Sequence, residues 1–170
     1  QYPYTVSSTG LSGAILPRWA QVGGREATLV RLADEEFYAR LHEEIKAGFQ
    51  GRGGADRIVV ANHPPDRDLE GLSLEQIAQN MGCDAADAGI RIYQAAETSV
   101  ISHSLREEDV VSIAAGSLVA VGSDGSSLST EGVLSAGKPH PRSYGTFPRF
   151  LSKYVREQKV VSLEEAIRKM

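Results

Sequence analysis

The sequence predicts a mixed α/β protein, because two kinds of segment alternate along its 170 residues. Short apolar runs, such as residues 58–61 and 118–121, are typical of buried strands. Between them lie longer segments whose apolar residues recur every three or four positions and which follow good helix-capping residues. No repeat with a period of about 20 to 50 residues is present in the sequence, which disfavours a solenoid or a propeller.

The first part of the chain predicts a strand, a turn and a helix. Residues 2–6 are predicted to end a strand, and residues 7–13, which are rich in Ser and Gly, to form a turn. Asp34 is predicted to cap the helix that follows it, because its side chain can accept a hydrogen bond from a main-chain N–H group of the first turn. The apolar stripe of this helix comprises Phe37, Leu41 and Ile45.

The middle of the chain predicts two helices and a strand. Ser73 and Gln76 have the spacing of a capping box, in which each side chain bonds the main-chain N–H group of the other residue. Asp84 is predicted to cap a second helix that runs to about residue 97. Residues 99–102 are predicted as the strand after it.

The last part of the chain predicts three helices. Ser104 and Glu107 have the spacing of a further capping box, which predicts a helix over about residues 105–115. A second helix is predicted over about residues 147–158, because its apolar residues share one face. Ser162 is expected to cap the final helix.

Composition and charge restrict the partners. The chain is 41% hydrophobic and 24% charged, which is typical of a soluble globular domain. Its net charge of −4 and its pI near 5.6 argue against binding to nucleic acid or to an anionic membrane. No apolar run approaches the roughly 20 residues of a membrane span. The single Cys83 cannot form an internal disulfide, so we expect a reducing, cytoplasmic location.

Asp124 is the leading candidate for a catalytic residue. It follows the apolar run 118–121 in an Asp-Gly turn, and parallel α/β folds place their active sites beyond the ends of such strands. A carboxylate at this position could take a proton from an attacking water and pass it to a leaving nitrogen. The alternative is that Asp124 only forms an Asx turn with Gly125.

Arg142 is the leading candidate for a substrate-binding residue. It lies between Pro141 and Tyr144 in a segment stiffened by proline, and a guanidinium can hold a carboxylate through two parallel hydrogen bonds. The alternative is a surface arginine that bonds loop carbonyls.

The four histidines do not form a local zinc motif. No pair is spaced two residues apart on a strand or four apart on a helix, as metal-binding pairs usually are. His42 and His63 are therefore expected to be solvated or structural, and His140 is expected to orient the loop that contains Arg142.

Five segments together resemble a known family. In chain order they are Tyr2-Pro-Tyr4, Ser8-Thr9, Ser123-Asp-Gly125, the ten-residue element His-Pro-Arg-Ser-Tyr-Gly-Thr-Phe-Pro-Arg at 140–149, and Leu-Glu-Glu-Ala-Ile-Arg-Lys-Met at 163–170. This order resembles the D-aminoacylase, or N-acyl-D-amino-acid deacylase, family of the amidohydrolase superfamily. The ten-residue element makes the resemblance specific, because a chance match to it is improbable.

The resemblance implies an α/β fold of a particular kind, the (β/α)8 barrel of a metallo-hydrolase. Because such barrels contain about 250 residues, the chain is expected to be the C-terminal part of one, with an inserted α+β lid subdomain. Residues 1–9 would supply a late barrel strand and a pocket loop, and residues 10–68 the lid. Residues 69–170 would supply the C-terminal barrel portion, with its last strand at 118–122, an active-site loop and the terminal helices.

The resemblance also implies hydrolysis of the amide bond of N-acyl-D-amino acids with the help of zinc. Asp124 would be both the catalytic acid–base group and a metal ligand, with the other zinc ligands upstream of Gln1. Arg142, Tyr2 and Ser8 would bind the α-carboxylate of the substrate.

The chain alone is therefore expected to be inactive, to bind no stoichiometric zinc and to self-associate. Two alternatives remain: an amidohydrolase for cyclic amides, of the dihydroorotase or hydantoinase kind, and a non-catalytic structural module.

Overall fold

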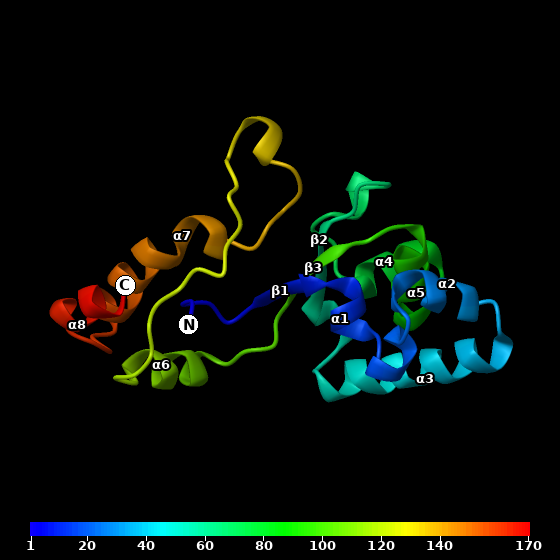
Figure 1. The fold of residues 1–170 in the computed structure, drawn as a ribbon, viewed down its shortest axis with the longest axis horizontal. Coiled ribbons are helices and arrows are strands. Elements are labelled where there is room, and N and C mark those ends of the chain that lie inside the picture. The colour runs from blue at the N-terminus through cyan, green and yellow to red at the C-terminus, as the bar shows by residue number, and fades with distance from the viewer. The chain divides into compact units, whose positions relative to one another are not determined.

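The computed structural model describes residues 1–170, which form two compact units. One unit is Ser8–Ser102, and the other joins Gln1–Ser7 to His103–Met170. In chain order the main elements are β1 (Ser7–Gly10), α1 (Leu11–Ile15), α2 (Gly24–Arg31), α3 (Glu35–Gly51), β2 (Ile58–Asn62), α4 (Leu74–Met81), α5 (Ala85–Ala95), β3 (Ser99–Ser102), α6 (Glu107–Ala115), α7 (Arg142–Arg149), a π-helix (Phe150–Glu157) and α8 (Leu163–Lys169) (Figure 1). None of the helices combines the length and apolar character that crossing a membrane requires.

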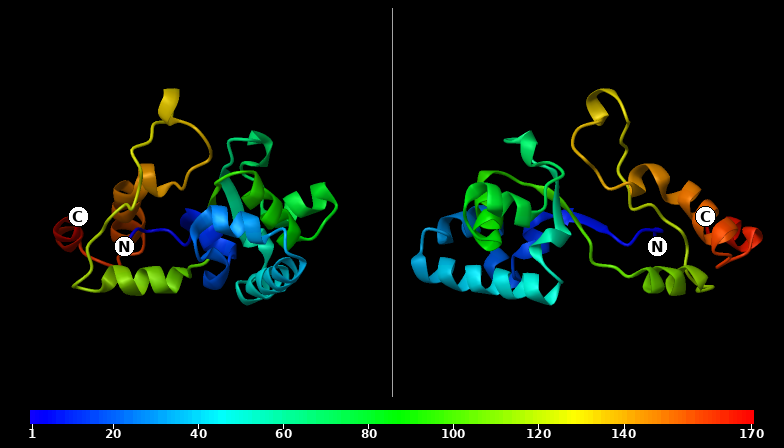
Figure 2. Two further views of the ribbon diagram at one scale, coloured as in Figure 1. Left: turned by 45° about the vertical axis from the view of Figure 1, so that its right-hand side comes forward. Right: turned by 180° about the vertical axis from the view of Figure 1, so that it is seen from behind.

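The unit Ser8–Ser102 contains a small three-stranded sheet in the order β1-β3-β2. Strands β2 and β3 are antiparallel, with Ile58 opposite Ser102 and Val60 opposite Val100. The register shifts between Val60 and Asn62. Helices α3, α4 and α5 lie together beside this sheet in both views of Figure 2. The predicted strands at 58–61 and 99–102 are therefore confirmed.

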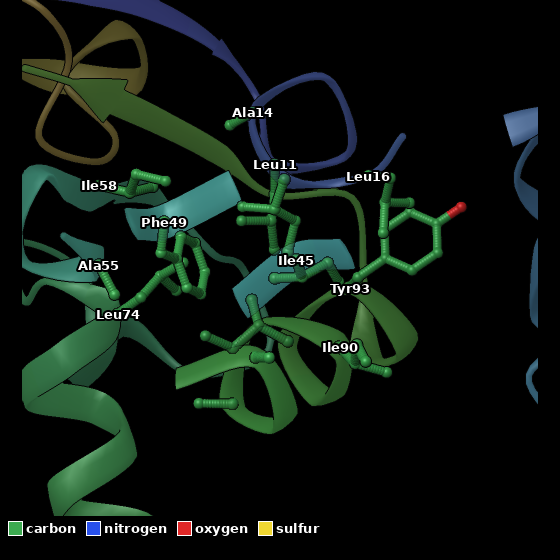
Figure 3. Close-up of a cluster of buried hydrophobic side chains, with 14 of the residues drawn as sticks. Leu11, Ala14, Leu16, Ile45, Phe49, Ala55, Ile58, Leu74, Ile90 and Tyr93 are labelled. Carbon is green, nitrogen blue, oxygen red and sulfur yellow. The ribbon is translucent and has the colours of Figure 1, made fainter. Parts of the chain in front are cut away.

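The core of this unit is formed by apolar side chains from its helices and its sheet (Figure 3). Leu41 and Ile45 of the predicted stripe are at most 1% exposed, and Phe37 is partly buried against the same cluster. Helix α1 approaches α5 closely at Gly89, where an added Cβ would lie 2.8 Å from the end of the Ile15 side chain. The amphipathic pattern of the sequence therefore identifies the buried face correctly.

Local capping signals are also confirmed. Asp34 accepts a hydrogen bond from the main-chain N–H of Phe37 at 2.8 Å, as predicted. Ser73 and Gln76 form both bonds of the capping box, at 3.2 and 2.9 Å. Asp84 caps α5, and Ser162 caps α8 through the N–H of Glu165.

The unit that joins Gln1–Ser7 to His103–Met170 has a smaller core. Its buried apolar residues are Val110, Ala114, Val121, Phe150, Tyr154 and Ala166. The buried ammonium of Lys169 bonds the carbonyls of Gly116 and Val119, just beyond the end of α6. Helix α8 therefore supplies a donor to two carbonyl groups of the segment that follows α6.

Two predicted strands are wrong. Residues 2–6 form no strand; β1 occupies Ser7–Gly10, where a turn was predicted, because those residues pair with β3. Residues 118–121 also form no strand: the N–H of Val121 bonds Lys169 and the N–H of Gly122 bonds Gln1, so no ladder with a single neighbour exists. An apolar run needs a partner strand as well as the right residues.

Two predicted helix starts are also wrong. Helix α6 begins at Glu107 without a side-chain cap, and the Ser104 hydroxyl lies 3.3 Å from that of Ser7 instead. The helix predicted from residue 147 begins earlier, at Arg142. Pro148 lies inside it, and the helix continues as a π-helix from Phe150. A proline has no N–H group to donate, which favours such a change of hydrogen-bond pattern.

Candidate functional site

The structure brings three of the four predicted site residues together. Tyr2, Asp124 and Arg142 all belong to the unit that joins Gln1–Ser7 to His103–Met170. Arg142 Nη2 lies 3.0 Å from Asp124 Oδ2, and the Arg142 guanidinium carbon lies 4.9 Å from the centre of the Tyr2 ring. Ser8 is a residue of β1 and belongs to the other unit.

The environment of Arg142 is much drier than that of Asp124. The Arg142 side chain is 12% exposed, whereas that of Asp124 is 73% exposed. The Arg142 guanidinium therefore lies between the face of the Tyr2 ring and the Asp124 carboxylate. The Asp124 carboxylate itself remains open to solvent.

The backbone around Asp124 is shaped for a close approach to α7. Asp124 has a φ of 49°, in the left-handed region that few residues other than glycine, Asn and Asp adopt readily. At Gly125 an added Cβ would lie 2.8 Å from the Cα of Ser143. The Gly125 N–H bonds the Ser123 hydroxyl, and the Ser126 N–H bonds the Ser143 hydroxyl. Serine hydroxyls, and not the Asp124 carboxylate, accept the N–H groups of the two residues after Asp124. These bonds are therefore not those of an Asx turn at Asp124.

His140 lies beneath this cluster. It is 3% exposed, and its ring is edge-on to Tyr2 and Tyr4, at 5.5 and 5.2 Å between ring centres. Its Nδ1 accepts the main-chain N–H of Arg142 at 2.9 Å, and its Nε2 lies 2.8 Å from the carbonyl oxygen of Val6. Burial lowers the pKa of His140, although the Val6 carbonyl partly opposes this effect. The expected role in orienting the loop agrees with these contacts.

A second arginine of the motif contacts the same N-terminal segment. The Arg149 guanidinium carbon lies 4.9 Å from the centre of the Tyr4 ring, and Arg149 Nε donates to the carbonyl of Pro3 at 2.6 Å. The Tyr4 hydroxyl lies 3.3 Å from the carbonyl of Pro141, and an added Cβ at Gly145 would lie 2.6 Å from that hydroxyl. The first residues of the chain and the ten-residue element are thus two sides of one packed contact.

The residues around Asp124 do not make a zinc site by themselves. A carboxylate oxygen suits zinc, but the close neighbour of Asp124 is a guanidinium, which has no lone pair to offer a metal. A group of three metal-ligating side chains lies in the other unit, at His42, Asp84 and Asp87. Asp124 belongs to no group of three metal-ligating side chains in the structure.

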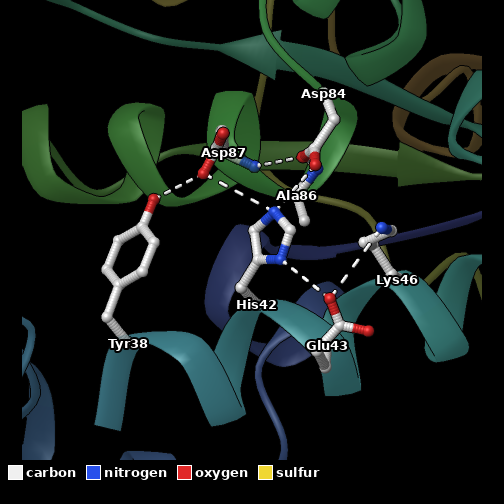
Figure 4. A network of polar contacts seen from close by, with 7 residues as sticks. All are labelled: Tyr38, His42, Glu43, Lys46, Asp84, Ala86 and Asp87. Atoms are coloured by element: carbon white, nitrogen blue, oxygen red, sulfur yellow. Dashed lines mark hydrogen bonds and ion pairs between the residues drawn. The ribbon is translucent and has the colours of Figure 1, made fainter. Parts of the chain in front are cut away.

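The group at His42 connects α3 to the first turn of α5 (Figure 4). His42 Nε2 lies 2.8 Å from Asp84 Oδ2 and 3.6 Å from Asp87 Oδ1. The other Asp84 oxygen accepts the N–H groups of Ala86 and Asp87, and the Tyr38 hydroxyl donates to Asp87 at 2.6 Å. Each carboxylate already has hydrogen-bond partners, so the group is explained as a contact between two helices.

The charges in this group shift two pKa values. Burial alone would raise the pKa of Asp84, but the N–H of Asp87 and the ring of His42 outweigh it and hold the pKa below its usual value. Burial and the hydrogen bond to Asp87 raise the pKa of Tyr38 to about 12. The folded structure therefore stabilises the ionised form of Asp84.

Curated relatives match about two thirds of this chain. The chain is 36% identical over 115 residues to the N-acyl-D-glutamate deacylase of Alcaligenes xylosoxydans xylosoxydans, and 32% identical over 116 residues to the D-aminoacylase of the same organism. Each match covers 68% of this chain and 22% of the relative. No protein-family model matches the chain.

Solved structures agree with these sequence matches. The N-acyl-D-glutamate deacylase of Bordetella bronchiseptica, complexed with zinc and a phosphonate inhibitor, matches with a TM-score of 0.64 and 27% identity. A D-aminoacylase matches with a TM-score of 0.62 and 27% identity. Both matches cover 99% of this chain and 26% of the other chain. The chain is a relative of the N-acyl-D-amino-acid deacylases. The resemblance read from its motifs is confirmed, and the chain spans about a quarter of the length of these deacylase structures.

Gly125→Ala should disturb the contact between the Asp124 loop and α7. The new Cβ would overlap the Ser143 main chain, so we expect the free energy of unfolding to fall by about 1–3 kcal/mol. Gly122→Ala is the matched control, because an added Cβ there meets no atom within 4 Å. Urea denaturation measures both variants, and equal stability of the two would contradict the packing described above.

Asp84→Ala should destabilise the chain in a pH-dependent way. At neutral pH we expect a loss of about 1–2 kcal/mol, because the cap of α5 and the partner of His42 both disappear. Since the pKa of folded Asp84 is lowered, this stabilisation is present above the unfolded value of about 3.9 and is lost as the pH falls through the folded value. Urea denaturation at neutral pH and at about pH 3 measures the change. The control is Asp68→Ala, at an exposed acid, which should have little effect at either pH. A stability difference between the wild type and Asp84→Ala that grows in acid would contradict the role given to Asp84.

Proposed function

We propose that this chain is part of a metal-dependent amidohydrolase that cleaves the amide bond of N-acyl-D-amino acids. Its relatives are named for deacylation of such compounds, and one was solved with zinc and a mimic of a tetrahedral intermediate. The observation that carries the proposal is the pairing of Asp124 with Arg142 beside Tyr2, since these residues come from the motifs that define the resemblance.

The proposed fold is the C-terminal part of a (β/α)8 barrel with an inserted lid. Residues 1–9 and 69–170 are proposed to belong to the barrel portion, and residues 10–68 to the lid. The compact unit Ser8–Ser102 contains the whole proposed lid, although the lid shares its core with Leu74, Ile77 and Val100 of the proposed barrel portion.

Arg142 is proposed to bind the α-carboxylate of the substrate. Its side chain is nearly buried, its guanidinium is held against Tyr2, and its contact with Asp124 shows that a carboxylate fits beside it. A planar guanidinium can form two parallel hydrogen bonds to such a group. Tyr2 and Ser8 are proposed to complete the polar surroundings of the carboxylate through their hydroxyl groups.

Asp124 is proposed to transfer the proton. Its exposed carboxylate would take a proton from the attacking water at one oxygen and give it to the nitrogen that leaves. Zinc is proposed for the whole enzyme, with Asp124 as one ligand. Asp124 belongs to no group of three metal-ligating side chains, so the roles proposed for the residues of this chain are proton transfer and binding of the carboxylate.

A cyclic-amide amidohydrolase is the second candidate. A cyclic amide or ureide ring need not carry a free carboxylate beside the scissile bond, so the buried guanidinium of Arg142 favours the linear substrate. A non-catalytic module is disfavoured, because the relatives that the chain matches are named as deacylases. A cytoplasmic location is proposed from the single Cys83.

Arg142→Lys in the enzyme that contains this chain should lower kcat/KM by roughly 10²-fold. An ammonium cannot reproduce the two-bond contact, and a charge-assisted interaction of this kind contributes about 3 kcal/mol. Steady-state kinetics with an N-acyl-D-amino acid measures the loss. The matched control is Arg156→Lys, at an exposed arginine. An equal loss on a substrate whose carboxylate is capped as an amide would refute the role of Arg142.

The 170-residue chain alone should bind less than one zinc per molecule and release no amine from N-acetyl-D-methionine, because a single carboxylate holds zinc weakly. Metal analysis and an amine-release assay test this expectation. A fully loaded and active preparation would show that the chain carries a complete site.

A further inference from the structure

We propose that His140 is a positioning residue of this site: a neutral imidazole, protonated at Nε2, that fixes the main chain of Arg142 and thereby aims its guanidinium at the substrate carboxylate. The inference rests on the proposed function of the site. It gives His140 a role in substrate affinity, which the sequence motif alone does not indicate.

The two hydrogen bonds of His140 determine its tautomer. The main-chain N–H of Arg142 can only donate, so Nδ1, 2.9 Å away, must carry a lone pair. The carbonyl of Val6 can only accept, so Nε2, 2.8 Å away, must carry the proton. Both ring nitrogens are therefore engaged, and only the neutral Nε2–H form satisfies both partners.

The surroundings of the ring favour this form and hold it still. Tyr2 and Tyr4 pack edge-on against the imidazole, which is almost fully buried. Burial lowers the pKa of His140 and the charge of Arg142 lowers it further, while the Val6 carbonyl and the charge of Asp124 oppose them. The net direction keeps the ring neutral near physiological pH.

The bond from Nδ1 acts on the start of α7. Arg142 is the first residue of this helix, so its N–H has no partner within the helix, and His140 provides one. Fixing this N–H fixes the direction in which the Arg142 side chain leaves the backbone. A two-bond grip on a carboxylate depends on that direction, because misplacement by about 1 Å can cost on the order of 10²-fold.

Two variants of the enzyme that contains this chain separate positioning from a general structural role. His140→Ala removes both bonds, whereas His140→Asn can place its side-chain oxygen near the position of Nδ1 and so keep the acceptor for Arg142. We expect His140→Ala to raise KM for an N-acyl-D-amino acid by about tenfold or more with a smaller change in kcat, and His140→Asn to recover most of that loss.

The control substrate is the same compound with its carboxylate capped as an amide, for which KM should change little. Equal losses on both substrates, or a His140→Asn enzyme as impaired as His140→Ala, would overturn the proposal.

The tautomer is tested independently of activity by nitrogen-15 NMR of labelled histidines in the same enzyme. The signals that vanish in His140→Asn belong to His140, and we expect one protonated nitrogen, Nε2, and one bare nitrogen, Nδ1. A proton on Nδ1 at neutral pH would overturn the proposal, even in an active enzyme. A wild-type enzyme without activity on N-acyl-D-amino acids would instead defeat the proposed function, and the NMR result would still decide the tautomer.

Discussion

The contact between the first residues of the chain and α7 is the constraint on which the candidate site depends. Arg142 lies over the ring of Tyr2, and Arg149 lies over the ring of Tyr4, each at 4.9 Å. Residues seven apart lie on one face of a helix, and residues two apart lie on one side of an extended segment. The two motifs therefore match each other in spacing.

Ionic attraction alone would not hold this geometry. Asp124 is 73% exposed, and exposed ion pairs contribute at most about 1 kcal/mol. The position of Arg142 comes instead from the half-buried ring of Tyr2 and the buried imidazole of His140. Gly125 then allows the acid to come close without a steric cost. The arginine is fixed by packing and hydrogen bonds, whereas the acid remains open to solvent.

The sequence predicts local structure well and long-range structure poorly. The caps at Asp34, Ser73 and Asp84 were predictable because each side chain bonds a main-chain group two or three residues away. The strands at 2–6 and 118–121 were not, because a strand depends on a neighbour that its own residues do not specify. In the site, the motifs singled out Asp124 and Arg142, but their contact with each other and the two bonds of His140 required the folded chain.

The two units are stabilised in different ways, and this difference bears on the site. The unit Ser8–Ser102 has a cluster of 21 buried apolar residues, whereas the other unit has a cluster of 6. Apolar burial contributes about 25 cal/mol per Å², so the first unit has the larger hydrophobic stabilisation. The second unit relies on polar contacts such as those of Lys169, Arg149 and His140. Because the candidate site lies among these contacts, each of its polar residues contributes both to the fold and to the position of Arg142. Substitutions there must therefore be judged by a readout that separates stability from substrate affinity.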